Sequence, residues 1–256
     1  MTRFYKSLWV IVLAIFALSC KDDEPLPLPI VDFSIDPPVV EVGVPVMFDN
    51  LSTNASRYEW DFGDGQDPIT DISPSVTFTS AGTVTVTLTA FTEDGQSVEA
   101  SKEVTVRERV LTGIFVNVFP ETNGGEGWDP DTVGVDTAAD IVVQLFPENS
   151  TDPNDAFVAG IFANIDQGPF GLNVDPAVQR IVLTDEDWLF FLLDFDGEDP
   201  ATATNDDFIT ISGVRFNPIQ VATFKSDDGT TGFVSVQVVD QSTNDVLDID
   251  LGFRLE

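Results

Sequence analysis

Apolar and polar residues alternate strictly in several segments of this chain, and this two-residue period limits its fold more than any other feature. In segment 83–89, valines and a leucine alternate with threonines, and segment 247–255 has Leu, Ile, Leu, Phe and Leu at every second position. Successive side chains of a β-strand point to opposite faces, so such segments have one buried and one hydrated face. Helical periodicity is nearly absent after residue 20. The sequence therefore predicts an all-β protein built from antiparallel sandwiches.

The first residues of the chain have the pattern of a signal peptide. Two basic residues precede an uncharged apolar run, residues 8–18, which is too short to span a bilayer as a helix. The run leads through Ala17-Leu18-Ser19 to Cys20, the single cysteine. This arrangement resembles the lipobox of bacterial lipoproteins, although alanine replaces the usual leucine three places before the cysteine. The resemblance implies that residues 1–19 are a cleaved signal peptide and that Cys20 carries lipid. An ordinary secretory signal cleaved near Ser19 is the alternative.

A short charged segment follows the cysteine. It resembles the acidic export signal of Bacteroidetes surface lipoproteins, and its members are Lys21, Asp22, Asp23 and Glu24. A solvated charge run is the alternative interpretation. Prolines at 25, 27 and 29 make the rest of segment 20–29 a stiff extended tether. The resemblance implies an outer-membrane protein that faces the cell exterior and contacts the membrane through its lipid anchor only.

Residues 30–108 form the first predicted domain. They contain the blocks YEWDFGDG at 58–65 and FTSAGT at 78–83, followed by the alternating strand. These blocks and their spacing resemble the PKD (polycystic kidney disease) repeat, which implies an immunoglobulin-like sandwich. Tyr58 and Trp60 alternate inward on one strand, and the glycines of the block permit a turn with positive φ. Asp61 and Asp64 are then residues that build the turn rather than catalysts.

Residues 109–256 form the second predicted domain. Its pattern predicts about eight strands, enough for a complete sandwich. The expected strands are 111–119, 140–145, 157–165, 179–184, 188–195, 208–216, 232–239 and 246–254. The fold class is therefore two antiparallel β-sandwiches in tandem behind a cleaved signal peptide.

Acidic residues gather at the ends of some of these strands. The alternation places Asp248 and Asp250 on the hydrated face of a strand, but other aspartates lie at strand-to-loop junctions. These resemble the calcium loops of the C-two-type β-sandwich, named after a conserved region of protein kinase C. The resemblance implies five metal ligands, which are Asp129, Asp140, Asp194, Asp196 and Asp207. Both loops are longer than usual for that family.

The chemistry of this set suits a hard cation. Ca²⁺ takes six to eight oxygen ligands, and converging carboxylates repel one another without it. The alternative is that these are ordinary loop acids of an acidic protein. A third interpretation is a glycoside hydrolase, in which paired acids act beside a platform formed by Trp128 and Trp188. A tryptophan on a strand is more often part of a core, and we expect no enzymatic activity.

Composition excludes several other classes of function. The chain has no histidine, which removes Ser-His, Cys-His and His-metal mechanisms. Its net charge of −33 would repel nucleic acid and anionic lipid, and we expect neither as a partner. Arg215 and Lys225 are interpreted as isolated cations, so the predicted loops have no basic cluster for lipid.

The sequence predicts a lipid-anchored binding or adhesion protein of the cell surface. In it a PKD stalk presents a calcium-stabilised sandwich to an extracellular protein or glycan. The main alternative is a carbohydrate-capture accessory of a polysaccharide-utilisation system, and the two differ in whether Trp128 or another aromatic side chain lies exposed on a flat face. Exposed aromatics with satisfied polar neighbours would favour sugar.

Overall fold

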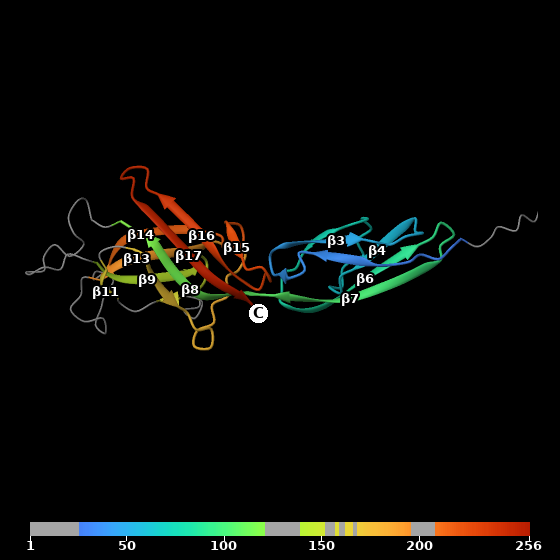
Figure 1. Cartoon of the computed structure of the whole chain (residues 1–256), viewed down its shortest axis with the longest axis horizontal. Helices are drawn as coiled ribbons and strands as arrows, with labels where there is room; N and C mark the ends of the chain where they lie inside the picture. Colours follow the sequence, from blue (N-terminus) through green and yellow to red (C-terminus); the bar gives the residue numbers. More distant parts are fainter. Residues whose placement is uncertain (1–25, 121–138, 152–156, 159–161, 166–167, 196–207) are drawn as a thin grey trace, which may run out of the picture.

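The computed structural model describes residues 26–120, 139–151, 157–158, 162–165, 168–195 and 208–256. Every regular element among these residues is a β-strand, which confirms the predicted all-β fold. The strands form two sandwiches that lie end to end along the long axis of the molecule (Figure 1). We call them the first sandwich, β1 to β7, and the second sandwich, β8 to β17.

The first sandwich consists of a three-stranded and a four-stranded sheet. The strands are β1 (Phe33–Asp36), β2 (Val40–Glu41), β3 (Pro45–Asn50), β4 (Arg57–Asp61), β5 (Ser75–Thr77), β6 (Gly82–Phe91) and β7 (Ser97–Arg107). One sheet has the order β1-β3-β5 and the other β2-β7-β6-β4. All pairs are antiparallel except β2 with β7, which run parallel. The two layers enclose an aromatic core.

The WDFGDG block behaves as the sequence predicts. Trp60 is fully buried, and its indole N–H donates to the Asp71 carbonyl at 3.0 Å. Gly63 and Gly65 have φ of +69° and +76°, values that a residue with a β-carbon rarely adopts. Asp61 accepts the Gly63 N–H at 2.8 Å, and the Asp64 carboxylate likewise accepts a backbone N–H two residues later. Both aspartates therefore build the turn.

The second sandwich consists of two five-stranded sheets. The strands are β8 (Arg109–Val118), β9 (Ala139–Pro147), β10 (Phe157–Val158), β11 (Phe162–Ile165), β12 (Phe170–Asn173), β13 (Trp188–Phe195), β14 (Phe208–Phe216), β15 (Thr223–Lys225), β16 (Thr231–Val239) and β17 (Val246–Leu255). One sheet has the order β10-β9-β13-β14, with β11 also paired to β9. The other has the order β12-β8-β17-β16-β15. All of these pairs are antiparallel.

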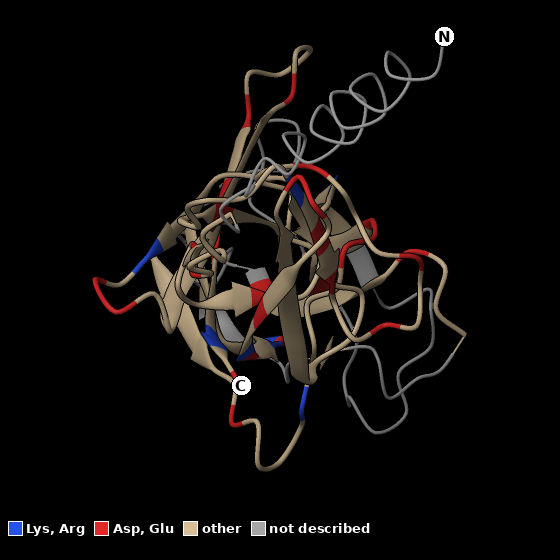
Figure 2. Ribbon diagram, turned by 90° about the vertical axis from the view of Figure 1, so that its right-hand side faces the viewer, with Lys and Arg blue, Asp and Glu red and all other residues tan. Residues whose placement is uncertain are grey.

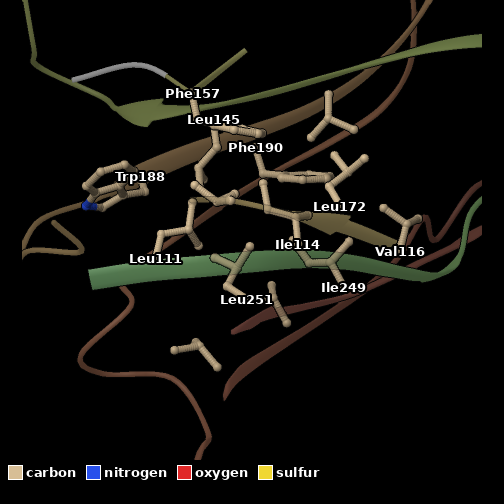
Figure 3. Close-up of a cluster of buried hydrophobic side chains, with 14 of the residues drawn as sticks. Leu111, Ile114, Val116, Leu145, Phe157, Leu172, Trp188, Phe190, Ile249 and Leu251 are labelled. Carbon is tan, nitrogen blue, oxygen red and sulfur yellow. The ribbon is translucent and has the colours of Figure 1, made fainter. Parts of the chain in front are cut away.

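Side chains from both sheets interlock in the core of the second sandwich. Figure 3 shows Ile114, Ile249 and Leu251 of one layer facing Leu145 and Phe190 of the other. All five side chains are completely buried. On β17 the residues at every second position from Leu247 to Leu255 are buried, as the alternation predicts. The period of two therefore decides which residues this core contains.

Most of the predicted strands form, but several segments differ. The expected strand 157–165 is replaced by two short strands, β10 and β11, which both pair with β9. The expected strand 179–184 runs beside the start of β8 with Ile181 and Leu183 buried, but it makes a single isolated bridge, Val110 to Val182, and no ladder. The strands β12 and β15 were not predicted. Each has only three or four residues, and β12 contains a glycine, so neither has a readable alternation.

The two sandwiches meet in a joint built around a buried ion pair. Glu41, at the end of β2, accepts hydrogen bonds from Arg109 of β8 and Lys225 of β15. Glu41 is 1% exposed and Arg109 is 3% exposed, and the Lys225 Nζ lies 2.6 Å from Glu41 Oε2. The Arg109 guanidinium also donates to the Pro218 carbonyl and lies 4.4 Å from the centre of the Phe253 ring. One carboxylate of the first sandwich thus pairs with two cations of the second.

Backbone bonds and apolar contacts complete the joint. Glu108 and Glu256 exchange two backbone hydrogen bonds of 3.0 Å, and Val39 of the first sandwich packs against the core of the second. Gly43, with φ of +79°, lies so close to Asp185 that a β-carbon there would come 3.1 Å from the Asp185 Cβ. The joint is therefore a close-packed contact as well as a covalent connection.

Arg215 and Lys225 each pair with acidic side chains that the sequence did not indicate. Lys225 contacts Glu41 in the joint, and the Arg215 guanidinium lies 2.7 Å from Glu148 and 2.6 Å from Asp187. Each pair joins residues far apart in the sequence, so no local pattern reveals it.

Candidate functional site

The structure describes two of the five aspartates predicted to bind metal. Asp140 and Asp194 lie on β9 and β13, whereas Asp129, Asp196 and Asp207 lie outside the described residues, as do Trp128, Cys20 and the segment 21–24. Within the described residues, no group of three or more His, Cys, Asp or Glu side chains is placed to hold a metal ion.

The Asp194 side chain contacts the backbone of Asp140 at the edge of the second core. β9 and β13 are neighbouring strands, and Asp194 lies opposite Ile141. The Asp194 side chain is completely buried, and its Oδ1 accepts the backbone N–H of Asp140 at 2.9 Å. A buried carboxylate is expensive to desolvate unless hydrogen bonds or a cation compensate its charge. This pair is therefore the described part of the predicted acidic constellation.

Trp188 does not form a sugar platform. It is 1% exposed, and its indole N–H donates to the Thr184 hydroxyl at 3.3 Å. A cleft of about 230 Å³ opens beside it, and its described lining contains one carboxyl group, that of Glu186. Glycoside hydrolysis of the usual kind needs a pair of carboxyl groups on either side of the scissile bond. This cleft does not supply such a pair.

A second candidate site lies on the outer surface of the sheet β12-β8-β17-β16-β15, on the side away from the core. We call this surface the open face. Figure 1 shows β8, β17, β16 and β15 side by side. Its polar half is a network of two carboxylates and two amides. Asn117 donates to Asp248 at 3.3 Å and to Asp250 at 3.0 Å, and Gln237 donates to Asp248 at 3.1 Å. The network confirms that Asp248 and Asp250 lie on the hydrated side of their strand.

Phe115 occupies the centre of the open face. It is 44% exposed, and its ring lies over glycines of three neighbouring strands, Gly171, Gly113 and Gly252. A β-carbon would come 2.7 Å from the ring at Gly171, 3.1 Å at Gly113 and 3.6 Å at Gly252. Both edges of the ring thus lie close to the backbone, so the ring lies flat against the sheet. The missing side chains provide the space for it.

Two further phenylalanines border this ring on the open face. Phe224 of β15 and Phe233 of β16 lie opposite each other, 53% and 39% exposed, with ring centroids 4.9 Å apart and planes 20° from parallel. Phe233 in turn lies opposite Gly252, over which the Phe115 ring extends. Sequence reasoning did not select these residues. The available signal was an apolar residue at an outward position of an alternating strand, beside strand glycines.

Acidic side chains greatly outnumber basic ones in this chain, 44 to 11. Figure 2 shows Asp and Glu on loops all around the molecule, with Lys and Arg at a few scattered places. On β17 the one cation that alternates with Asp248 and Asp250 is Arg254, whose guanidinium pairs with Glu256. The described part of the open face therefore offers hydrogen-bond acceptors and aromatic rings, and no cation that is free to bind an anion.

The comparisons with known proteins agree with the geometry of the first sandwich. The family model described as PKD domain matches residues 27–107. Residues 27–107 are a PKD domain. Two similar solved structures are the PKD1 domain of Vibrio anguillarum Epp, 28% identical, and the PKD1 domain of the Vibrio cholerae metalloprotease PrtV, 32% identical. They cover 32% and 31% of this chain and 96% and 98% of their own, each with a TM-score of 0.28.

A match that extends beyond the PKD domain is remote. A structure of carbohydrate-binding modules from the β-sandwich superfamily covers 90% of this chain and 93% of its own, with 12% identity and a TM-score of 0.30. At that level the similarity carries no functional assignment. No curated protein matches the chain. None of the described residues belongs to a helix long and apolar enough to cross a membrane.

Proposed function

We propose that this chain is a lipid-anchored binding protein of the cell surface, in which the PKD domain holds the second sandwich away from the membrane. The supporting observation is the arrangement along the long axis. Leu26, the first described residue, lies beside Asn54 and Thr92, whereas the joint involves Glu108, which directly follows the other end of β7. The second sandwich therefore lies at the end of the PKD domain opposite the tether (Figure 1).

The joint supports the same proposal. A flexible connection would let the second sandwich fold back towards the membrane. Here, the ion pair of Glu41 with Arg109 and the backbone exchange between Glu108 and Glu256 fix its direction. An oriented spacer of this kind suits a protein that presents a binding domain to extracellular ligands.

Membrane fractionation and surface proteolysis of intact cells test the anchor. Cys20→Ala should move the protein from the membrane fraction to the soluble fraction, because Cys20 is the proposed lipid attachment site. Replacing Asp22, Asp23 and Glu24 by alanine should keep the protein in the membrane but protect it from added protease. An exposed acid beyond the tether, such as Glu99→Ala, is the control and should change neither result. Wild-type protein without lipid, or a triple variant that stays accessible, would contradict the proposal.

Carbohydrate capture is the favoured version of this binding role. The observation behind it is the open face, where exposed phenylalanines lie beside carboxylates and amides that hydrogen-bond to one another. Such a surface meets the criterion set out from the sequence, exposed aromatics with satisfied polar neighbours. An adhesion partner made of protein is the alternative ligand.

We also propose that Ca²⁺ binds where Asp140 and Asp194 meet, with Asp129, Asp196 and Asp207 as the remaining protein ligands. Carboxylate oxygens are the donors that Ca²⁺ prefers, and the buried Asp194 carboxylate beside Asp140 supplies part of such a set. The ion would neutralise the clustered acids and stabilise this end of the second sandwich.

A further inference from the structure

We propose that the open face binds an uncharged polysaccharide, with Phe115 as the ring on which a sugar stacks. Asp248 and Asp250 are the hydrogen-bond acceptors for its hydroxyls. This inference rests on the function proposed above, because it names the ligand class and the site of the same binding protein.

The glycines beneath Phe115 carry the first step of the argument. Glycine weakens a strand interior, so Gly171 and Gly113, where a β-carbon would crowd a neighbouring group, indicate that something approaches the backbone closely. What approaches is the Phe115 ring, which comes within 2.7 Å of the position of a β-carbon at Gly171. One face of the ring is thus against the sheet, and the other is turned to solvent. An aromatic face held flat at the surface is a platform for another flat, apolar face.

A sugar ring matches this platform and its surroundings. The faces of a pyranose expose C–H groups, which suit the electron-rich face of an aromatic ring, while its edges carry hydroxyls. Asp250 lies opposite Phe115 in the register of β17 and β8, so acceptors for those hydroxyls lie next to the platform. Asn117 and Gln237 already hold the two carboxylates in place. Prior ordering of these groups reduces the entropy lost on binding.

The phenylalanine pair extends the site along the sheet. Because β15 lies on the far side of β16 from β17, Phe224 covers the face of Phe233 that points away from Phe115. From Phe224 to Phe115 the open face spans three strand spacings, roughly 14 Å. A surface of that length suits several linked sugars rather than a single one.

Charge determines which polysaccharide fits. The carboxylates of Asp248 and Asp250 repel uronic acids, sulfated glycans and phosphates, and Arg254 is engaged by Glu256. Hydroxyl groups, in contrast, donate to carboxylates at short distance. An uncharged polysaccharide is therefore the occupant that matches both the acceptors and the rings.

Affinity electrophoresis of the full chain tests the inference. The protein is solubilised in a detergent without a sugar headgroup and run through gels containing mixed-linkage β-glucan, xyloglucan, mannan or soluble starch, with polygalacturonate as the charged comparison. We expect at least one uncharged polysaccharide to retard the protein and polygalacturonate not to do so. Phe115→Ala should weaken that retardation about 10- to 30-fold in Kd, the effect of removing a central aromatic anchor.

Phe191 offers a matched control on the other sheet. A β-carbon at Gly213 would come 2.6 Å from its ring, so Phe191 also covers a glycine of the neighbouring strand. If the packing of a ring over glycine serves only stability, Phe115→Ala and Phe191→Ala should both lower the melting temperature, and neither should change binding. We expect only the first to weaken binding. Asp250→Asn keeps the shape of this half-buried side chain and removes its charge, and it should weaken binding about tenfold with little change in the melting temperature.

The outcomes separate this inference from the function on which it rests. If no uncharged polysaccharide retards the protein, or if polygalacturonate retards it more, the ligand class is wrong. If Phe115→Ala and Asp250→Asn are both retarded as strongly as the wild type, the protein binds sugar at another site and only the site is wrong. Surface display is measured separately, by protease accessibility on intact cells and by fractionation of Cys20→Ala, and the Phe115, Phe191 and Asp250 variants should not change it. Its loss would overturn the proposed function itself.

Discussion

Replacing Glu41 by glutamine would open the joint between the PKD domain and the second sandwich. The variant keeps the size of the side chain and removes its charge, which leaves the buried Arg109 without its counter-ion. Removing one partner of a buried ion pair costs about 3–5 kcal/mol. Each sandwich has its own core, so the chain can relieve the unpaired charge by separating the two sandwiches and letting water reach Arg109. The loss should therefore appear as opening of the joint rather than as unfolding.

Limited proteolysis with trypsin measures that opening. Trypsin cuts after Arg and Lys, and Arg107 and Arg109 flank the connection between β7 and β8. When opening is fast relative to cleavage, the rate follows the population of the open form, so 3–5 kcal/mol corresponds to roughly 100-fold faster cutting or more. Mass spectrometry identifies cuts at these two arginines.

An exposed ion pair of the PKD domain provides the control. Glu59 pairs with Arg57, and their side chains are 39% and 54% exposed, so Glu59→Gln should cost no more than about 1 kcal/mol and leave the joint closed. Equal cleavage rates in the wild type and Glu41→Gln would refute the reasoning. The same conclusion would follow if the two variants were cut equally fast.

Three further perturbations test other parts of the structure. Trp60→Ala removes a completely buried ring from the PKD core and should lower the free energy of unfolding, measured by urea titration, by about 3–5 kcal/mol. A loss below about 1 kcal/mol would mean that the pocket collapses around the alanine or that the ring is not buried in solution. Millimolar Ca²⁺ should raise the melting temperature of the full chain more than Mg²⁺ does. Asp194→Asn should abolish this shift, whereas Asp248→Asn should retain it. Equal shifts with both ions would indicate charge screening alone. The pKa of Asp228 is lowered from 3.8 to about 2 by hydrogen bonds from the Thr230 N–H and from the Ser226 and Thr230 hydroxyls. The stabilising contribution of this carboxylate is therefore complete above about pH 4 and is lost as the pH falls towards about 2. A titration midpoint near 4, measured by NMR for the Asp228 carboxyl group, would show that these bonds do not form in solution.

Local patterns predicted most of the fold because the information they use is local. The two-residue period of segments such as 246–254 identifies a strand and its buried face without any knowledge of the partner strand, and β17 confirms it. The WDFGDG block predicted its turn because glycines and short acidic side chains act on their own backbone. Short strands such as β15 were missed, since three residues form a strand there only because β16 is present as a template.

The sequence by itself determined the class of fold, the PKD domain and the buried side of each long strand. Tertiary structure alone decided which charges meet and which surface carries a candidate site. Glu41 and Lys225 are far apart in the chain, and Phe115 lies on glycines of three different strands, so neither arrangement leaves a trace in local spacing. The physical reason is the range of the interactions. Strand alternation and turn chemistry act within a few residues, whereas ion pairing and ring stacking depend on distances that exist only after the sheets have assembled.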